Sequence, residues 1–131
     1  MTRYSLLLVA ALLVLVAVPV AQAQTAHAAA TVTVIAGKPS EFKFKLSTTT
    51  FKHGAVTFKV TDSGALGHDF SICTKATTKA ATTCASKGTA VISPGGSATL
   101  KFTFLKAGTY EYICKVPGHA AAGMKGLMKV T

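Results

Sequence analysis

Hydrophobic and polar residues alternate along most of the chain after Ala30. In the segment EFKFKL (41–46) every second residue is apolar, and lysines occupy the positions between. The same period of two recurs in TVTVI (31–35), AVTFKVT (55–61), ATLKFTF (98–104), TYEYIC (109–114) and LMKVT (127–131). Such alternation is typical of strands with one buried face. The residues expected to point inward are Val32, Val34, Phe42, Phe44, Leu46, Val56, Phe58, Val60, Leu100, Phe102, Phe104, Tyr110, Tyr112, Cys114, Met128 and Val130.

Short segments rich in glycine, proline and serine separate these alternating runs, at 37–39, 53–54, 62–64, 94–96 and 107–108. About six or seven short strands with polar outer faces, joined by such turns, predict an all-β fold, an antiparallel β-sandwich. Residues 74–90 follow neither the strand period nor the helix period. We therefore expect a long surface excursion there, with no extended helix.

The first 23 residues have the layout of a secretory signal peptide. Arg3 gives a positive start, residues 6–18 are apolar and uncharged, and Ala21-Gln22-Ala23 offers a small-residue cleavage site. Ala28 marks a second cleavage site. A retained membrane anchor is the alternative, although the uncharged stretch 5–21 is short for a span. We predict an exported chain with a signal peptide at 1–23 and a single domain at 24–131.

The chain is strongly basic, with 14 Lys and Arg against 4 Asp and Glu and a formal net charge of +10. A basic surface attracts anionic partners. The single spacing of the lysines, the lack of arginine after Arg3 and the predicted export all argue against nucleic acid. An acidic protein or an anionic membrane surface fits better. Lysines that only keep the strand faces soluble are the simplest interpretation.

Three cysteines in an exported protein predict one disulfide and one remaining thiol. Cys73 and Cys84 are separated by the flexible segment TKATTKAATT, which a disulfide would close with a stabilisation of about 2–3 kcal/mol. Cys114 is then the free thiol. Because a free thiol outside the cytosol tends to be oxidised, a bound metal is a reason for its presence.

Three potential metal ligands lie in one short segment, CKVPGHAAAGM (114–124). The expected strand ends at Cys114, which points inward. Turns at Pro117-Gly118 and at Gly123 then bring His119 and Met124 back towards the thiol. A fourth donor, His68, lies in GALGHDF (64–70), outside any regular pattern. The other histidines, His27 and His53, have no partner at ligand spacing, and Met128 alternates with core residues.

The four donors His68, Cys114, His119 and Met124 favour copper over zinc. Soft sulfur suits Cu(I) and imidazole suits Cu(II), so that a trigonal His, His and Cys site with a weak axial Met serves both oxidation states. Zinc also binds His and Cys, but it gains nothing from Met and has no redox chemistry. Each donor has a simpler interpretation when taken alone, as a turn histidine, a core methionine or a disulfide cysteine.

The segments CKVPGHAAAGMKG and GHDF resemble those of the cupredoxins, the plastocyanin/azurin family of small blue copper proteins. The spacing of Cys, His and Met is similar to the rusticyanin, auracyanin and sulfocyanin type. The resemblance implies a Greek-key β-sandwich from residue 30 onwards, with His68, Cys114, His119 and Met124 as ligands of one type 1 copper. Many members have Asn after the first histidine, where it braces the cysteine loop. This chain has Asp69 there, which bears on the redox potential and its pH response.

These features lead us to expect an exported one-electron carrier, a monomer located in the periplasm, in the cell envelope or outside the cell. Its redox partners would have acidic docking surfaces, and peripheral contact with an anionic membrane is a second option. An envelope copper chaperone or buffer is the alternative function. Multicopper catalysis needs further histidines at ligand spacing, so we do not expect an enzyme. A metal-free adhesion-type sandwich would leave the four donors unexplained.

Overall fold

The structure, a computed structural model, describes residues 29–131, in which every regular element is a strand. The nine strands are β1 (Ala30–Ala36), β2 (Phe44–Leu46), β3 (Thr50–Phe51), β4 (Gly54–Asp62), β5 (Ser71–Cys73), β6 (Ser86–Gly88), β7 (Ser97–Phe104), β8 (Gly108–Ile113) and β9 (Lys125–Val130). Residues 29–131 contain no helix long and apolar enough to cross a membrane. The predicted signal peptide and its cleavage sites lie outside the described residues.

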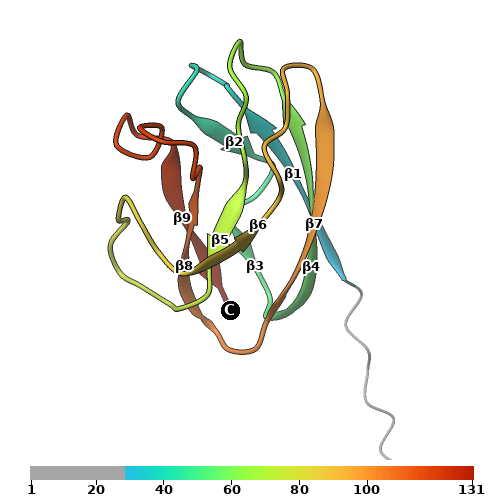
Figure 1. The fold of residues 1–131 in the computed structure, drawn as a ribbon. Coiled ribbons are helices and arrows are strands. Elements are labelled where there is room, and N and C mark those ends of the chain that lie inside the picture. Colours follow the sequence, from blue (N-terminus) through green and yellow to red (C-terminus); the bar gives the residue numbers. More distant parts are fainter. Residues whose placement is uncertain (1–28) are drawn as a thin grey trace, which may run out of the picture.

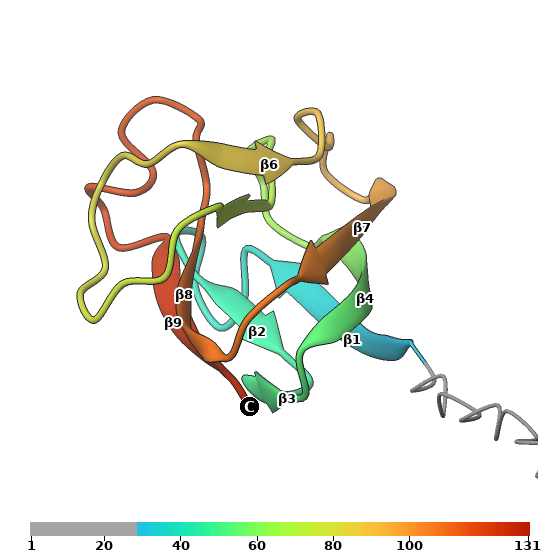
Figure 2. The same ribbon diagram turned by 90° about the horizontal axis from the view of Figure 1, so that it is seen from below.

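The strands form two facing sheets, with the orders β2-β1-β4-β7 and β3-β9-β8-β5-β6 (Figures 1 and 2). The predicted all-β, Greek-key sandwich is confirmed. Most neighbouring strands are antiparallel, but β1 pairs in parallel with β4, and β3 with β9. β1 and β4 are parallel because the chain visits the second sheet, where it forms β3, before it returns to the first sheet as β4. The chain therefore crosses between the sheets after β2, and β4 returns alongside β1 in the same direction.

The core between the sheets consists of the inward residues of the alternating runs. Phe58, Phe70 and Phe104 are at most 1% exposed, and their rings form a connected set of tilted and edge-to-face contacts with Phe51 and Tyr110. Burial of each such ring contributes about 1.5–3 kcal/mol to the free energy of folding. Most of the expected inward residues are buried; Phe42, Phe44, Leu46, Phe102 and Tyr112 are only partly buried.

Strand β8 departs from the expected alternation, because both of its faces are covered. Glu111 lies on the face expected to be polar and exposed, yet it is only 2% exposed, and the neighbouring Ile113 is 1% exposed. The excursion that follows β5 covers this face: the backbone N–H of Ala81 donates to Glu111 Oε1 at 2.8 Å. Residues 74–90 are thus a covering segment as well as a surface excursion, and they include the short strand β6.

The predicted disulfide between Cys73 and Cys84 is present, with a Cα–Cα distance of 5.7 Å. It joins the end of β5 to the segment just before β6, so that it closes the base of the excursion. Cys73 packs against Ile113 and Ala120, and Cys84 borders this small cluster. The third cysteine, Cys114, is free and buried, as predicted.

Four connections meet at one end of the sandwich, at the top of Figure 1. They are the turn between β1 and β2, the segment between β4 and β5, the segment between β6 and β7, and the loop between β8 and β9. All four predicted metal ligands lie in these connections. The end of β9 lies at the opposite end of the molecule (Figure 1).

Candidate metal centre

The loop between β8 and β9 carries three of the predicted ligands and is closed by its own backbone hydrogen bonds. The N–H of Cys114 donates to the carbonyl of Met124 at 3.0 Å, and the N–H of Met124 donates to the carbonyl of His119 at 2.9 Å. Gly118 and Gly123 have φ angles of +84° and +105°, which side-chain-bearing residues rarely adopt. The two bends predicted at these glycines therefore fold the loop back over Cys114.

The fourth predicted ligand, His68, lies just before β5 and is held by an isolated antiparallel bridge to Ile92. The N–H of His68 donates to Ile92 at 3.1 Å, and the N–H of Ile92 donates back at 2.7 Å. Because β5 pairs directly with β8, this bridge positions His68 next to the strand that ends just before Cys114.

The donor atoms of His68, Cys114 and His119 converge at this end of the sandwich. The two histidine Nδ1 atoms are 3.1 Å apart, and Cys114 Sγ lies 3.5 Å from His119 Nδ1. All three donor atoms lie within 4.8 Å of one another. His68 and Cys114 are fully buried, whereas His119 is 8% exposed. The site is therefore closed on the core side and approaches the surface only at His119.

Met124 is fully buried and packs with Cys114 and Ala36 in one cluster. The structure thus brings together all four residues that the sequence singled out. His53 lies elsewhere, with its Nδ1 3.1 Å from the carbonyl oxygen of Thr131, and Met128 belongs to the main core. His27 lies outside the described residues.

The spacing of these donors fits one metal ion. Two imidazole nitrogens that each bind an ion at about 2 Å are about 3–3.5 Å apart, as the two Nδ1 atoms are here. A thiolate and two imidazoles with a nearby thioether are the donor set of type 1 copper sites. The residues therefore fit copper, and His68, Cys114 and His119 would hold the ion, with Met124 as the weaker fourth donor.

Burial raises the pKa of the Cys114 thiol to about 11, and the neighbouring Asp69 carboxylate acts in the same direction. Burial and the nearby His68 lower the pKa of His119 below its ordinary value. At neutral pH the thiol therefore keeps its proton while the His119 imidazole is uncharged. A metal that binds here has to displace the thiol proton.

Asp69 braces the cysteine loop. Its Oδ1 accepts hydrogen bonds from the backbone N–H groups of Lys115 at 2.6 Å and Val116 at 3.2 Å, and from the Cys114 thiol at 3.4 Å. Its Oδ2 accepts from the Ser71 hydroxyl at 2.7 Å, and the side chain is 5% exposed. Asp69 thus occupies the bracing position that the resemblance assigns to Asn, but it brings a carboxylate close to the sulfur.

Glu41, in the turn between β1 and β2, is a neighbour of the site that the sequence analysis missed. Its Oε1 lies 2.9 Å from His68 Nε2, on the side of the ring away from His119. The backbone N–H groups of Ala65 and Leu66 also donate to this carboxylate, and these hydrogen bonds lower the pKa of Glu41. One signal was present: Glu41 is one of only four acidic residues and lies in a lysine-rich strand pattern.

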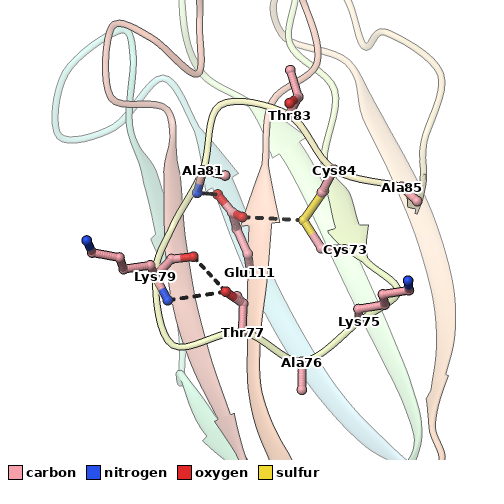
Figure 3. Close-up of a pocket in the computed structure, with 10 residues that line it drawn as sticks. All are labelled: Cys73, Lys75, Ala76, Thr77, Lys79, Ala81, Thr83, Cys84, Ala85 and Glu111. Carbon is pink, nitrogen blue, oxygen red and sulfur yellow. Dashed lines mark hydrogen bonds between the residues drawn. A yellow bond between two sulfur atoms is a disulfide. The ribbon is translucent and has the colours of Figure 1, made fainter.

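A second group of sulfur and carboxylate atoms lies beneath the excursion, where Cys73, Cys84 and Glu111 come together. Figure 3 shows Glu111 pointing towards the disulfide, in a pocket of about 380 Å³ that also includes Lys75 and Lys79. The two sulfurs are bonded to each other, so neither is available as a thiolate. None of the four predicted ligands lines this pocket, so it is separate from the four-donor centre.

The surface above His119 is small and largely apolar. Pro117, Gly118, Ala121 and Ala122 are exposed, while Ala120 is buried against the disulfide cluster. A shallow depression of about 520 Å³ lies beside the loop, with Val91, Val116 and Pro117 in its lining. The ring of Phe42 contacts His119 edge to face, with ring centroids 5.1 Å apart.

Known proteins resemble this chain in both sequence and structure. Residues 19–131 match the family of copper binding proteins, plastocyanin/azurin family. The copper-resistant cuproprotein CopI of Rubrivivax gelatinosus is 32% identical over 98 residues, which is 67% of this chain and 59% of that protein. The chain therefore spans less than two thirds of that curated relative.

Two solved structures illustrate the likeness of the fold. Auracyanin from Roseiflexus castenholzii has a TM-score of 0.64 at 24% identity, over 80% of this chain and 99% of that one. Rusticyanin from Thiobacillus ferrooxidans has a TM-score of 0.57 at 30% identity, over 77% of this chain and 76% of that one. With the family match over most of the chain, these findings show that the protein belongs to the cupredoxins, the plastocyanin/azurin family of copper binding proteins, and that its cofactor is copper.

Proposed function

We propose that this protein is an exported type 1 copper protein that carries single electrons between redox partners, with His68, Cys114, His119 and Met124 as the ligands of one copper ion. The observation that carries the proposal is the convergence of three donor atoms within 4.8 Å of one another in a largely buried site. Bound copper would supply a one-electron couple between Cu(II) and Cu(I). The protein itself would not be an enzyme.

The residues around the donors favour a carrier because they hold the ligands nearly fixed. The loop that carries Cys114 and Met124 is tied by its own backbone hydrogen bonds, and Asp69 ties it to the segment before β5. A site that changes little between two oxidation states exchanges electrons with little rearrangement. Burial of the thiol also excludes water and free thiols from the sulfur.

Electrons would enter and leave through His119, the ligand nearest the surface. The apolar residues Pro117, Ala121 and Ala122 surround it and would allow close approach of a partner protein. Small apolar contacts of this kind suit short-lived complexes. We expect the apolar patch to set the distance between the two redox centres.

The charge of the surface supports an acidic partner. Of the 13 lysines in residues 29–131, all are exposed except Lys125, which is half-buried. Asp62, Asp69 and Glu111 are buried and Glu41 is partly buried, so the described part of the chain has no fully exposed acidic side chain. An acidic redox protein would therefore be attracted by long-range electrostatics, and added salt would slow the association.

A redox cycling experiment tests the proposal. The copper-loaded domain (residues 24–131) is reduced and reoxidised repeatedly in the presence of a Cu(I) chelator, while the thiolate-to-copper absorption band and the bound copper are measured. A carrier retains its copper and recovers the full band in each cycle. Loss of copper to the chelator at each reduction would contradict an electron carrier.

An envelope copper buffer or chaperone is the second candidate. It is favoured by the likeness to CopI, whose name describes it as a copper-resistant cuproprotein. In that case the same experiment gives rapid transfer of copper to the chelator. The disulfide between Cys73 and Cys84 supports an oxidising compartment such as the periplasm for either function.

A further inference from the structure

Glu41 makes a direct contact with a predicted copper ligand from a distant part of the sequence. Its Oε1 lies 2.9 Å from Nε2 of His68, while Nδ1 of the same ring lies 3.1 Å from Nδ1 of His119. The two nitrogens of His68 therefore have different partners. One faces the carboxylate, and the other faces the remaining ligands.

The structure leaves room for this contact at Gly64. A Cβ atom at this position would lie 2.6 Å from Glu41 Oε1 and 2.8 Å from His68 Nε2, closer than real contacts allow. The neighbouring residues Ala65 and Leu66 donate their backbone N–H groups to the same carboxylate, at 3.0 Å and 2.8 Å. The segment before His68 is thus shaped around Glu41 by its backbone.

We propose that Glu41 is a positioning residue for the copper site, which fixes the proton of His68 on Nε2 and lowers the reduction potential of the bound copper. The proposal rests on the copper ligation proposed above. A carboxylate that accepts from the outer nitrogen of a ligand histidine sets its tautomer and makes it a stronger donor. The inner nitrogen, Nδ1, is then free to bind the metal.

The sign of the effect on the potential follows from charge. A carboxylate next to a ligand stabilises the more positive oxidation state, so Glu41 favours Cu(II) over Cu(I). Loss of an outer-shell partner of this kind typically costs about 10–100-fold in metal affinity. If Cu(II) affinity falls tenfold and Cu(I) affinity is unchanged, the potential rises by about 59 mV.

A purely structural role makes a different prediction, because Glu41 also holds the backbone of Ala65 and Leu66. Glu41→Gln removes the charge, but an amide oxygen in place of Oε1 can still accept from Leu66, His68 and Ala65; only the second hydrogen bond from Ala65, to Oε2, is lost. Glu41→Ala removes both the charge and the acceptor. Glu111→Gln is the control, since it removes an equal charge from a residue that contacts the excursion and no ligand.

The test measures the reduction potential of the four copper-loaded proteins by spectroelectrochemistry. The exchange of the His68 Nε2 proton is followed by NMR in the diamagnetic Cu(I) form. We expect a higher reduction potential in both Glu41 variants and an unchanged potential in Glu111→Gln. The His68 Nε2 proton should be protected from exchange in every protein except Glu41→Ala. An unchanged potential in Glu41→Gln, or an Nε2 proton that exchanges equally fast in wild type and Glu41→Ala, would overturn the proposal.

The outcome for the wild-type protein separates this inference from the proposed function. If wild type shows no thiolate-to-copper band, the copper site itself fails. If wild type shows the band and Glu41→Gln has the wild-type potential, only the role of Glu41 fails.

Discussion

Two clusters in this protein each place a sulfur atom against a buried carboxylate. In one, Cys73 Sγ lies 3.5 Å from Glu111 Oε2, and in the other, Cys114 Sγ lies 3.4 Å from Asp69 Oδ1. Both are buried, and they lie on neighbouring strands, since β5 ends at Cys73 and β8 ends just before Cys114. Their chemistry is nevertheless different.

The difference comes from the partner of each sulfur. Cys73 is bonded to Cys84, so its sulfur carries no proton and cannot act as a thiolate ligand. Cys114 has no cysteine partner and instead faces the imidazoles of His68 and His119. The disulfide uses both other cysteines and so leaves Cys114 as the one free thiol beside the two imidazoles. The comparison shows that only one of the two sulfur and carboxylate clusters keeps a thiol that could bind a metal.

The largest expected effect separates the two clusters directly. We expect Cys114→Ser to lose the thiolate-to-copper absorption band completely, because the serine hydroxyl cannot replace a thiolate as a soft ligand. The matched control is the double variant Cys73→Ser and Cys84→Ser, which should retain the band. Visible absorption after copper addition measures both. A band of equal intensity in Cys114→Ser would exclude this residue as the ligand.

The double variant should instead lose stability. The disulfide closes a short segment, and its removal is expected to cost about 2–3 kcal/mol in the free energy of unfolding. Urea denaturation of the copper-free proteins measures this loss, with Cys114→Ser as the comparison. Stability equal to that of wild type would show that the disulfide adds nothing to the contacts that already hold the excursion, such as the hydrogen bond from Ala81 to Glu111.

The raised pKa of Cys114, to about 11, predicts that copper uptake depends on pH. Below that pKa the metal competes with one thiol proton, so the apparent Cu(II) affinity should rise about tenfold per pH unit, for example between pH 7.5 and 9. The lowered pKa of His119 leaves its ring neutral in this range, so it adds no further proton.

A titration in weak buffer checks this prediction by counting the protons released. We expect about one proton per copper in wild type and none from this position in Cys114→Ser. The folding stability of the copper-free protein changes with pH in the opposite direction. The raised pKa of Cys114 favours the folded state below the pKa of the unfolded thiol, and this contribution to stability is lost as the pH rises through about 11. Affinity that is independent of pH would contradict a protonated thiol.

The smallest expected effect concerns the carboxylate beside each sulfur. Asp69→Asn keeps an oxygen acceptor for the backbone of Lys115 and Val116 but removes a negative charge next to Sγ, so the reduction potential should rise. Glu111→Gln removes a charge beside the disulfide and should leave the potential unchanged. Spectroelectrochemistry of the two variants compares them. Equal shifts in both would mean that net charge alone sets the potential.

Much of the fold and of the site could be predicted from the sequence, because local patterns encode them. Period-two alternation gave the strands around Val32, Phe58 and Phe104, and the spacing of Cys114, His119 and Met124 gave the loop. The burial of Glu111 could not be predicted, since the strand pattern does not show which segment covers its outer face. Glu41 was missed for a similar reason: its contact with His68 joins turns that are far apart in sequence.

The parallel pairing of β1 with β4 was also not predictable from alternation, which is the same for either strand direction. Direction depends on the path between the sheets, and the two-residue strand β3 that redirects the chain has no alternating pattern of its own. The disulfide, by contrast, could be predicted, because only three cysteines were available and the segment between Cys73 and Cys84 is short and flexible.

The closed hydrogen bonding of the loop between β8 and β9 has a consequence for how such a site can be inherited. Cys114, His119 and Met124 lie in one uninterrupted stretch, and its ends are held by the pairing of Ile113 with Lys125. A single recombination event could transfer these three proposed ligands into another sandwich with the same strand pair. His68 could not follow, because its position depends on Ile92 and its outer nitrogen on Glu41. The proposed copper site therefore joins one continuous loop to a separate segment, which is held by contacts distant in sequence.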